Sequence, residues 1–292
     1  MPQAADIGSG PRWRRYTKWL LKGFGALLGV LAASTAIWAM LYPDAAAYLM
    51  QSAKGQWQLL SQGEPVADLL AQPDTPAELK RQLKLVAEVK AFAEGELGLK
   101  ATRNYETYLD LKRDYLVMVL TGSPPLKMTS ETWWFPIVGT VPYKGYFDKT
   151  MGLADQKKLS ARGLETHFRP SPAYSTLGWF TDPLLSTMLM YGDDYLVNTV
   201  IHESVHATHW ISGEVTFNEN MASFIGNQGA LRFYLQKFGK DSKNYRDALD
   251  KLADQERFAA FMNAVGKEMG KLYDSDLSEA EKLKRKPELI KT

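Results

Sequence analysis

The sequence predicts an α+β protein that is predominantly helical, with a small sheet and one transmembrane helix ahead of the folded domain. Three observations lead to this expectation. An uncharged apolar run covers residues 23–42. Apolar residues at helical spacing fill most of residues 44–98 and 193–273. Between these helical parts, residues 115–180 contain short β-branched and aromatic stretches separated by glycine and proline, which is typical of strands and turns.

The N-terminal segment combines basic residues with this apolar run. The run has the ~20 residues that a bilayer core of about 30 Å requires, and aromatic residues at Trp19, Trp38 and Tyr42 suit the membrane interfaces. The upstream basic residues predict that residues 1–22 stay in the cytoplasm and that the rest is exported; they are Arg12, Arg14, Arg15, Lys18 and Lys22. A cleaved signal peptide is the alternative, although its apolar core is usually shorter.

The remaining chain, residues 44–292, is expected to form one domain that begins with a helical part, residues 44–98. Apolar residues predict a helix over residues 44–72, which the prolines of residues 73–76 end. A second helix should begin there, with Thr75 and Glu78 as a capping box. These helices are expected to be a scaffold.

Residues 115–180 are expected to contain the strands. Strand-like runs cover residues 115–120 and 132–141, the second interrupted by proline and glycine. A helix should follow over residues 152–162, and a third strand over residues 165–169. The aromatic, turn-rich segment 172–180 is either a packing loop or a wall of a substrate cleft.

Two helices in residues 193–239 carry the most informative motif, His202-Glu203-Ser204-Val205-His206. Histidines four apart lie about 40° apart on one helix face, so both imidazoles can reach one metal ion. Glu203 points to the side, where it can take a proton from a metal-activated water. Asp193 or Asp194 can cap this helix, and Gly213 can end it.

The residues alone allow two roles for the candidate third ligand. Glu219 on the following helix is the natural candidate, and three protein ligands with one open position are typical of a catalytic zinc ion. Glu219 is also at the third position of a possible capping box that begins at Thr216. His209 is about 60° off the metal-facing direction and is expected near the site or at the surface. One long helix over residues 243–273 and a charged, solvated tail over residues 279–292 are expected to complete the chain over residues 243–292.

Composition excludes several kinds of site. The 292-residue chain contains no cysteine, so disulfides and cysteine-ligated zinc are excluded. Its net charge is +2, with basic residues dispersed among 33 acidic ones. No basic patch interleaved with aromatics is present, so no nucleic-acid partner is expected.

Residues 48–239 resemble a bacterial family of membrane-anchored zinc aminopeptidases. The resemblance rests on Lys54-Gly55-Gln56, Trp133 through Pro136, Tyr143 through Asp148, the segment 172–188, and the metal motif with Asn218-Glu219-Asn220-Met221-Ala222. It implies a gluzincin-type site with one zinc ion held by His202, His206 and Glu219, and Glu203 as catalytic base.

The motif and the resemblance together predict a zincin-like metallopeptidase domain at the periplasmic face of the bacterial inner membrane, anchored by a single helix. Its substrate would be a peptide that loses N-terminal residues. Tyr174 is the first choice for the oxyanion donor, followed by Tyr143, Tyr146 and His209. By residue type, Glu165 and Asp182 are candidates to bind the substrate amine.

Two other functions stay open on sequence alone. One is an endopeptidase with the same metal site. The other is a non-catalytic, membrane-tethered binding or assembly protein, because relatives tend to continue beyond the position of Thr292. The sequence leaves the oligomeric state undefined.

Overall fold

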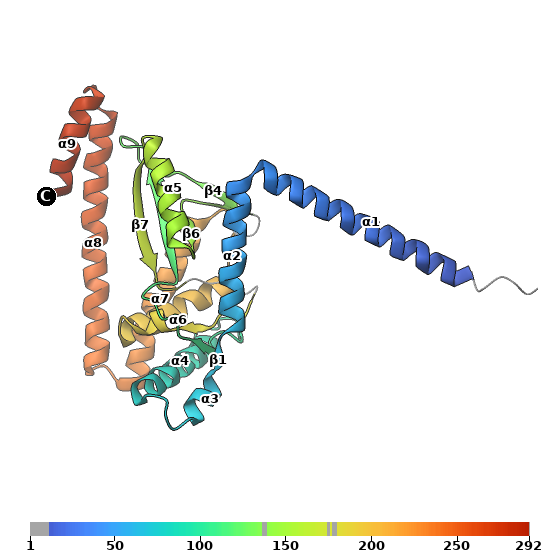
Figure 1. Ribbon diagram of the computed structural model, residues 1–292. Helices are drawn as coiled ribbons and strands as arrows, with labels where there is room; N and C mark the ends of the chain where they lie inside the picture. Colours follow the sequence, from blue (N-terminus) through green and yellow to red (C-terminus); the bar gives the residue numbers. More distant parts are fainter. Residues whose placement is uncertain (1–11, 136–138, 174–175, 177–179, 292) are drawn as a thin grey trace, which may run out of the picture. The chain divides into compact units, whose positions relative to one another are not determined.

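The computed structural model describes residues 12–135, 139–173, 176 and 180–291 and divides into two compact units, Met1–Gln51 and Ser52–Thr292 (Figure 1). The first unit contains α1 (Arg12–Leu41) and the beginning of α2 (Pro43–Ser61). Within α1, Trp19–Leu41 spans 23 residues with a mean hydropathy of 1.9. By length and composition this helix can cross a membrane, so the predicted N-terminal apolar helix is present.

The second unit begins with the helical part that the sequence predicts, although with an interruption. After α2 come β1 (Glu64–Pro65), α3 (Val66–Ala71) and α4 (Ala77–Gly95). The capping box predicted for α4 is wrong, because Pro76 is the N-cap and no side chain caps the helix. Glu78 instead pairs with Arg81 at 2.7 Å, and Arg81 also binds Asp193 at 2.6 Å. The Glu78 carboxylate therefore binds the guanidinium of Arg81, which also links α4 to Asp193, and does not cap the helix.

The strands form small sheets. β1 pairs antiparallel with β2 (Thr107–Leu109), which pairs parallel with β8 (Leu184–Leu185). β3 (Val117–Ser123) lies between β6 (Lys144–Tyr146) and β7 (Glu165–Ser171), antiparallel to both. β4 (Trp133–Phe135) pairs with β5 (Gly139–Val141). The structure is therefore predominantly helical with small sheets, as predicted.

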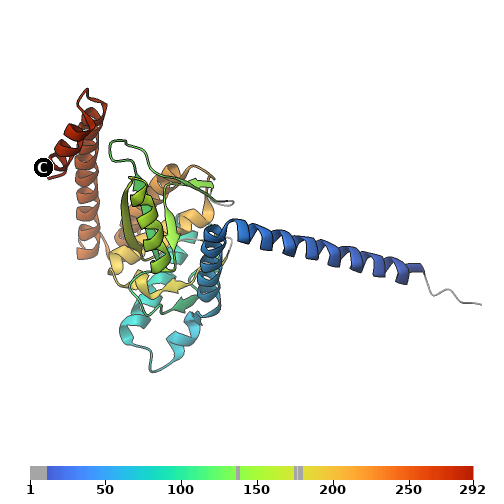
Figure 2. The same ribbon diagram turned by 45° about the horizontal axis from the view of Figure 1, so that its top comes forward.

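Helix α5 (Lys149–Ala161) packs on β3 and β7 (Figure 2). Gly152 allows the close approach, because a Cβ at this position would lie 2.4 Å from Cζ of Phe168. Asp155 on the same helix accepts hydrogen bonds from Tyr146 Oη at 2.6 Å and Lys144 Nζ at 2.9 Å. These contacts tie α5 to β6.

Helices α6 (Asp193–Thr208) and α7 (Val215–Phe238) follow a short 3₁₀ helix, η1 (Ser186–Leu189). The apolar face of α6 is fully buried in the core, and its residues with 0% exposure are Leu196, Val197, Val200, Ile201 and Val205. Neither aspartate caps α6, because Gly192 is the N-cap. The helix also ends at Thr208, ahead of Gly213, because His209 adopts an extended conformation with φ −136°.

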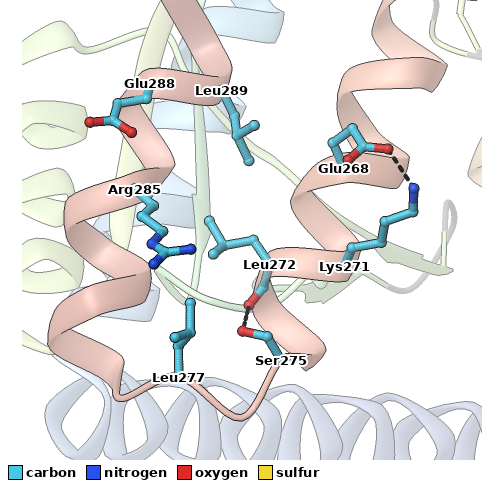
Figure 3. A pocket seen from close by; sticks show the side chains of 8 residues that line it. All are labelled: Glu268, Lys271, Leu272, Ser275, Leu277, Arg285, Glu288 and Leu289. Carbon is cyan, nitrogen blue, oxygen red and sulfur yellow. Dashed lines mark hydrogen bonds and ion pairs between the residues drawn. The ribbon is translucent and has the colours of Figure 1, made fainter.

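The C-terminal region consists of the long helix α8 (Lys243–Asp274) and α9 (Glu279–Lys291), which folds back along it. The tail expected to be charged and solvated is therefore helical. A hollow of about 340 Å³ lies between the two helices, with Leu272, Leu277 and Leu289 on its walls and Arg285 and Glu288 at its rim (Figure 3). It includes none of the residues of the metal motif.

Candidate metal centre

Three side chains from two helices converge on one point. The Nε2 atoms of His202 and His206 on α6 lie 3.1 Å apart. On α7, Glu219 places Oε2 at 3.5 Å from His202 Nε2 and Oε1 at 3.6 Å from His206 Nε2. One ligand atom from each residue lies within 4.8 Å of the other two. This arrangement could hold a metal ion, and it brings together the three residues predicted as ligands.

The capping-box alternative for Glu219 is wrong. Helix α7 begins at Val215, with Glu214 as N-cap and no side chain bonded to the free N–H groups. Glu219 is therefore inside the helix, and its carboxylate is directed to the two histidines instead of the helix start. The antiparallel packing of α6 and α7 decides between the two roles.

Asn218 holds the loop that joins the two helices. Its side chain is fully buried and accepts a hydrogen bond from Ile211 N at 3.0 Å while donating one to Ile211 O at 2.7 Å. The amide of the buried Asn218 is thereby satisfied by both backbone groups of one loop residue. The side chain of Asn218 therefore clamps this loop immediately before Glu219.

The charges of the site stabilise an ionised Glu219. Contacts with His202 and then His206 lower the pKa of Glu219 to about 2, against the opposing effect of burial. Burial lowers the pKa of His202, but the contact with Glu219 and the charge of Glu203 outweigh it and raise the pKa above its usual value. The side chain of Glu219 is 43% exposed and that of His206 only 5%. The site therefore opens to solvent on its α7 side.

Glu203 is half-buried beside the histidine pair and lies among tyrosines. Burial raises its pKa, the charges of His202 and His206 oppose this, and those of Glu219 and Asp182 add to it. Burial raises the pKa of Tyr143 to about 12, with further contributions from the charges of Glu219 and Glu203. Tyr143 is thus the predicted secondary candidate that lies close to both carboxylates.

The other predicted oxyanion donors have different positions. Tyr174 lies outside the described residues. Tyr146 is completely buried and donates its hydroxyl to Asp155. His209 is exposed at the end of α6, where its N–H bonds Val205 O at 2.8 Å. Neither Tyr146 nor His209 is among the residues that converge on the metal centre.

The two acidic residues predicted to bind the substrate amine lie in different parts of the structure. Glu165 at the start of β7 pairs with Lys286 of α9. Asp182 is 7% exposed, accepts a hydrogen bond from Thr176 N at 3.0 Å, and raises the pKa of Glu203 through its charge. Of the two, Asp182 is the one whose charge acts on the His202–His206 motif, through Glu203.

Sequence reasoning missed Tyr105. It is buried, and its φ of 66° is in the left-handed region that a bulky residue rarely adopts. Its N–H bonds Asp182 O at 2.8 Å, while Asp182 N bonds Asn104 Oδ1 at 2.9 Å. Burial and then the charges of Glu203 and Asp182 raise its pKa. No local pattern indicates this contact, because Tyr105 and Asp182 are 77 positions apart in the sequence.

Comparison with known proteins gives one positive result. No curated protein and no solved structure matches the chain significantly. A family described as "Putative aminopeptidase" matches residues 47–292, which include all three residues of the candidate metal centre. The family assignment suggests peptide hydrolysis. The chain belongs to this family of putative aminopeptidases.

Proposed function

We propose that the protein is a zinc-dependent peptidase that removes N-terminal residues from peptides. The observation that carries the proposal is the convergence of His202, His206 and Glu219 with Glu203 beside them. Membership of the putative aminopeptidase family supports the reaction class.

The donor set fits one zinc ion. Ligand atoms at about 2.0–2.1 Å from a tetrahedral zinc ion lie roughly 3.3 Å from each other. The separations of 3.1, 3.5 and 3.6 Å in this site bracket that value. Two imidazoles and one carboxylate are also the ligands that catalytic zinc sites use, with the fourth position open. When bound, zinc would polarise the scissile carbonyl and lower the pKa of a water molecule at the open position.

Glu203 would act as the general base and then the general acid. It accepts a proton from the attacking water and passes that proton to the leaving amine. Partial burial suits this role, because it raises the pKa of Glu203 toward the working range of a proton-transfer group.

A donor to the developing oxyanion and an anchor for the substrate amine complete the proposal. Tyr174 remains a predicted oxyanion donor. Tyr143 is a second candidate, because it lies close enough to Glu203 and Glu219 for their charges to raise its pKa. A protonated phenol can donate to an oxyanion, and the raised pKa of Tyr143 keeps it protonated at neutral pH. Asp182 is the proposed partner of the free amine.

The proposed location is the periplasmic face of the bacterial inner membrane. It rests on the apolar segment Trp19–Leu41 and the basic residues ahead of it.

The test compares wild type with Glu203→Gln, both purified and zinc-loaded. Wild type should hydrolyse aminoacyl reporter amides, and Glu203→Gln should lose about 10²–10⁴ in kcat while it keeps its zinc. Blocked internal peptides serve as the control for exopeptidase action. Cleavage of blocked peptides alone would show an endopeptidase, and an unchanged kcat in Glu203→Gln would remove it from the mechanism.

A further inference from the structure

Helix α2 carries an apolar stripe on an exposed side. Its four large side chains are Leu49 (53% exposed), Met50 (71%), Trp57 (71%) and Leu60 (39%). At 3.6 residues per turn these four lie within about 100° around the helix axis, and the same arc contains Ala46 and Ala53. No charged residue of α2 lies in this arc. These six residues are called the α2 stripe below.

The other side of α2 packs against the fold. Gly55 and Leu59 are the buried residues of the helix. A Cβ at Gly55 would overlap the ring of Phe147, so this contact is close. Trp57 lies about 160° around the axis from both buried residues. A helix at a protein surface normally turns its polar residues outward, whereas α2 turns the stripe outward.

The stripe follows directly on the helix that is long and apolar enough to cross a membrane. Only Tyr42 separates α2 from α1. The rings of Trp38 and Tyr42 lie 6.1 Å apart at this junction, and such aromatic residues are enriched at membrane interfaces. If α1 crosses the bilayer, the beginning of α2 therefore lies at the membrane surface.

The direction of α2 then decides what surrounds the stripe. Leu60 follows Leu41 by 19 residues, so an α2 perpendicular to the membrane would place Leu60 about 28 Å into water. An α2 parallel to the membrane keeps the whole stripe at the interface. The parallel direction removes apolar side chains from water, and it is therefore the favourable one.

A lipid surface suits the stripe better than a protein partner does. Stable protein interfaces use about 20–30 residues on each side, far more than the stripe offers. Asp44 and Lys54 are the only charged residues of α2 and have opposite signs, so no net charge selects a charged partner. Interfacial helices, by contrast, bury one apolar face about 5–10 Å into the boundary between headgroups and acyl chains.

We propose that α2 is an interfacial helix whose stripe lies in the bilayer surface, next to the membrane-crossing α1. The inference rests on the proposed membrane location and is independent of catalysis. The stripe would fix the rotation of α2 about its axis, so that Gly55 and Leu59 face away from the lipid. The protein then has two contacts with the membrane, one that crosses it and one that lies along its surface.

The test uses single-cysteine variants of the full-length protein in phosphatidylcholine vesicles. The chain contains no cysteine, so each introduced thiol takes the only nitroxide label. Ala53→Cys and Leu60→Cys report on the stripe. Gln58→Cys is the matched control, because it is exposed on the same helix about 140–160° away from both. Leu31→Cys reports on α1.

Power saturation then compares oxygen, which concentrates in lipid, with a water-soluble nickel chelate. The oxygen-to-nickel accessibility ratio should be severalfold higher at Ala53→Cys and Leu60→Cys than at Gln58→Cys. Trp57→Glu in the Leu60→Cys protein should lower this ratio, because a charged side chain is disfavoured in the interface. Gln58→Glu, a charge outside the stripe, should leave the ratio unchanged.

Each other result would overturn the proposal. Equal ratios at the stripe positions and Gln58→Cys, with a lipid-exposed label at Leu31→Cys, would remove the interfacial helix while the membrane crossing stands. A water-exposed label at Leu31→Cys would remove the membrane location as well. Spin–spin broadening at Leu60→Cys would show a second copy on the stripe, and a label shielded from both reagents would show a protein contact.

Discussion

Asn218 holds Ile211 by both backbone groups, and this clamp lies immediately before Glu219. The loop between α6 and α7 therefore cannot shift without breaking two hydrogen bonds to a buried side chain. Because Glu219 is the only candidate ligand on α7 among the described residues, the clamp fixes the distance between the carboxylate and the histidine pair.

Loss of the clamp should weaken both the fold and metal binding. Asn218→Ala removes two hydrogen bonds of about 0.5–1.5 kcal/mol each, so the free energy of unfolding should fall by about 1–3 kcal/mol. Asn218→Asp keeps the acceptor for the N–H and is the matched control. Thermal unfolding of metal-free protein measures the first effect and zinc titration the second. An unchanged melting temperature and an unchanged zinc affinity in Asn218→Ala would show that the loop keeps its conformation without this side chain.

Removal of one metal ligand should remove the metal. Wild type should bind one zinc ion and become more stable, by about 2.7 kcal/mol at a free zinc concentration of 100 Kd. A chelator should reverse the gain. Glu219→Ala should lose both the bound zinc and the gain in stability. Glu214→Ala changes a carboxylate outside the site, at the N-cap of α7, and is the control. Stoichiometric zinc in Glu219→Ala would contradict the assigned ligand set.

Tyr143→Phe should lower kcat with little change in KM, because an oxyanion donor acts mainly in the transition state. If the Tyr143 hydroxyl is the oxyanion donor, kcat should fall by a factor of about 10²–10³. Tyr146→Phe is a useful comparison, since its hydroxyl is bonded to Asp155 and should affect stability instead. A full loss of activity in Tyr174→Phe with normal activity in Tyr143→Phe would assign the donor to Tyr174.

Asp155 should make stability depend on pH. Burial raises its pKa, but hydrogen bonds from Tyr146 and Lys144 outweigh burial and hold it below the usual 3.8. A depressed folded-state pKa gives stability that is present above the unfolded value and lost as pH falls. Asp155→Asn should therefore be less stable than wild type at pH 7, and the difference should shrink below about pH 4. A difference that stays constant with pH would assign the effect to packing.

Two glycine-to-alanine changes should have opposite signs. At Gly152 an added Cβ would lie 2.4 Å from Cζ of Phe168, so overpacking between α5 and β7 should cost about 1–3 kcal/mol. At Gly270 in α8 no atom lies within 4 Å of such a Cβ. There, alanine should stabilise by about 0.5–1 kcal/mol through helix propensity. Chemical denaturation measures both values, and a neutral Gly152→Ala would show that Phe168 can move aside.

Local patterns determined a large part of this protein. The spacing of His202 and His206 predicted one helix face for both ligands, and the absence of cysteine limited the third ligand to histidine or a carboxylate. The apolar N-terminal run predicted a helix that the structure contains. These features depend on residues close in sequence, where helix geometry alone relates the side chains.

Tertiary structure decided the features that join distant segments. Glu219 fits both a capping box and a ligand set by local pattern, and only the antiparallel packing of α6 against α7 places it beside the histidines. Tyr105 bonds Asp182 from a loop far upstream, and Tyr234 lines a cavity between α6, α7 and α8. Sequence periodicity predicts each helix or strand separately and does not show how these elements pack together. The positions of these side chains depend on that packing, so the sequence alone could not predict them.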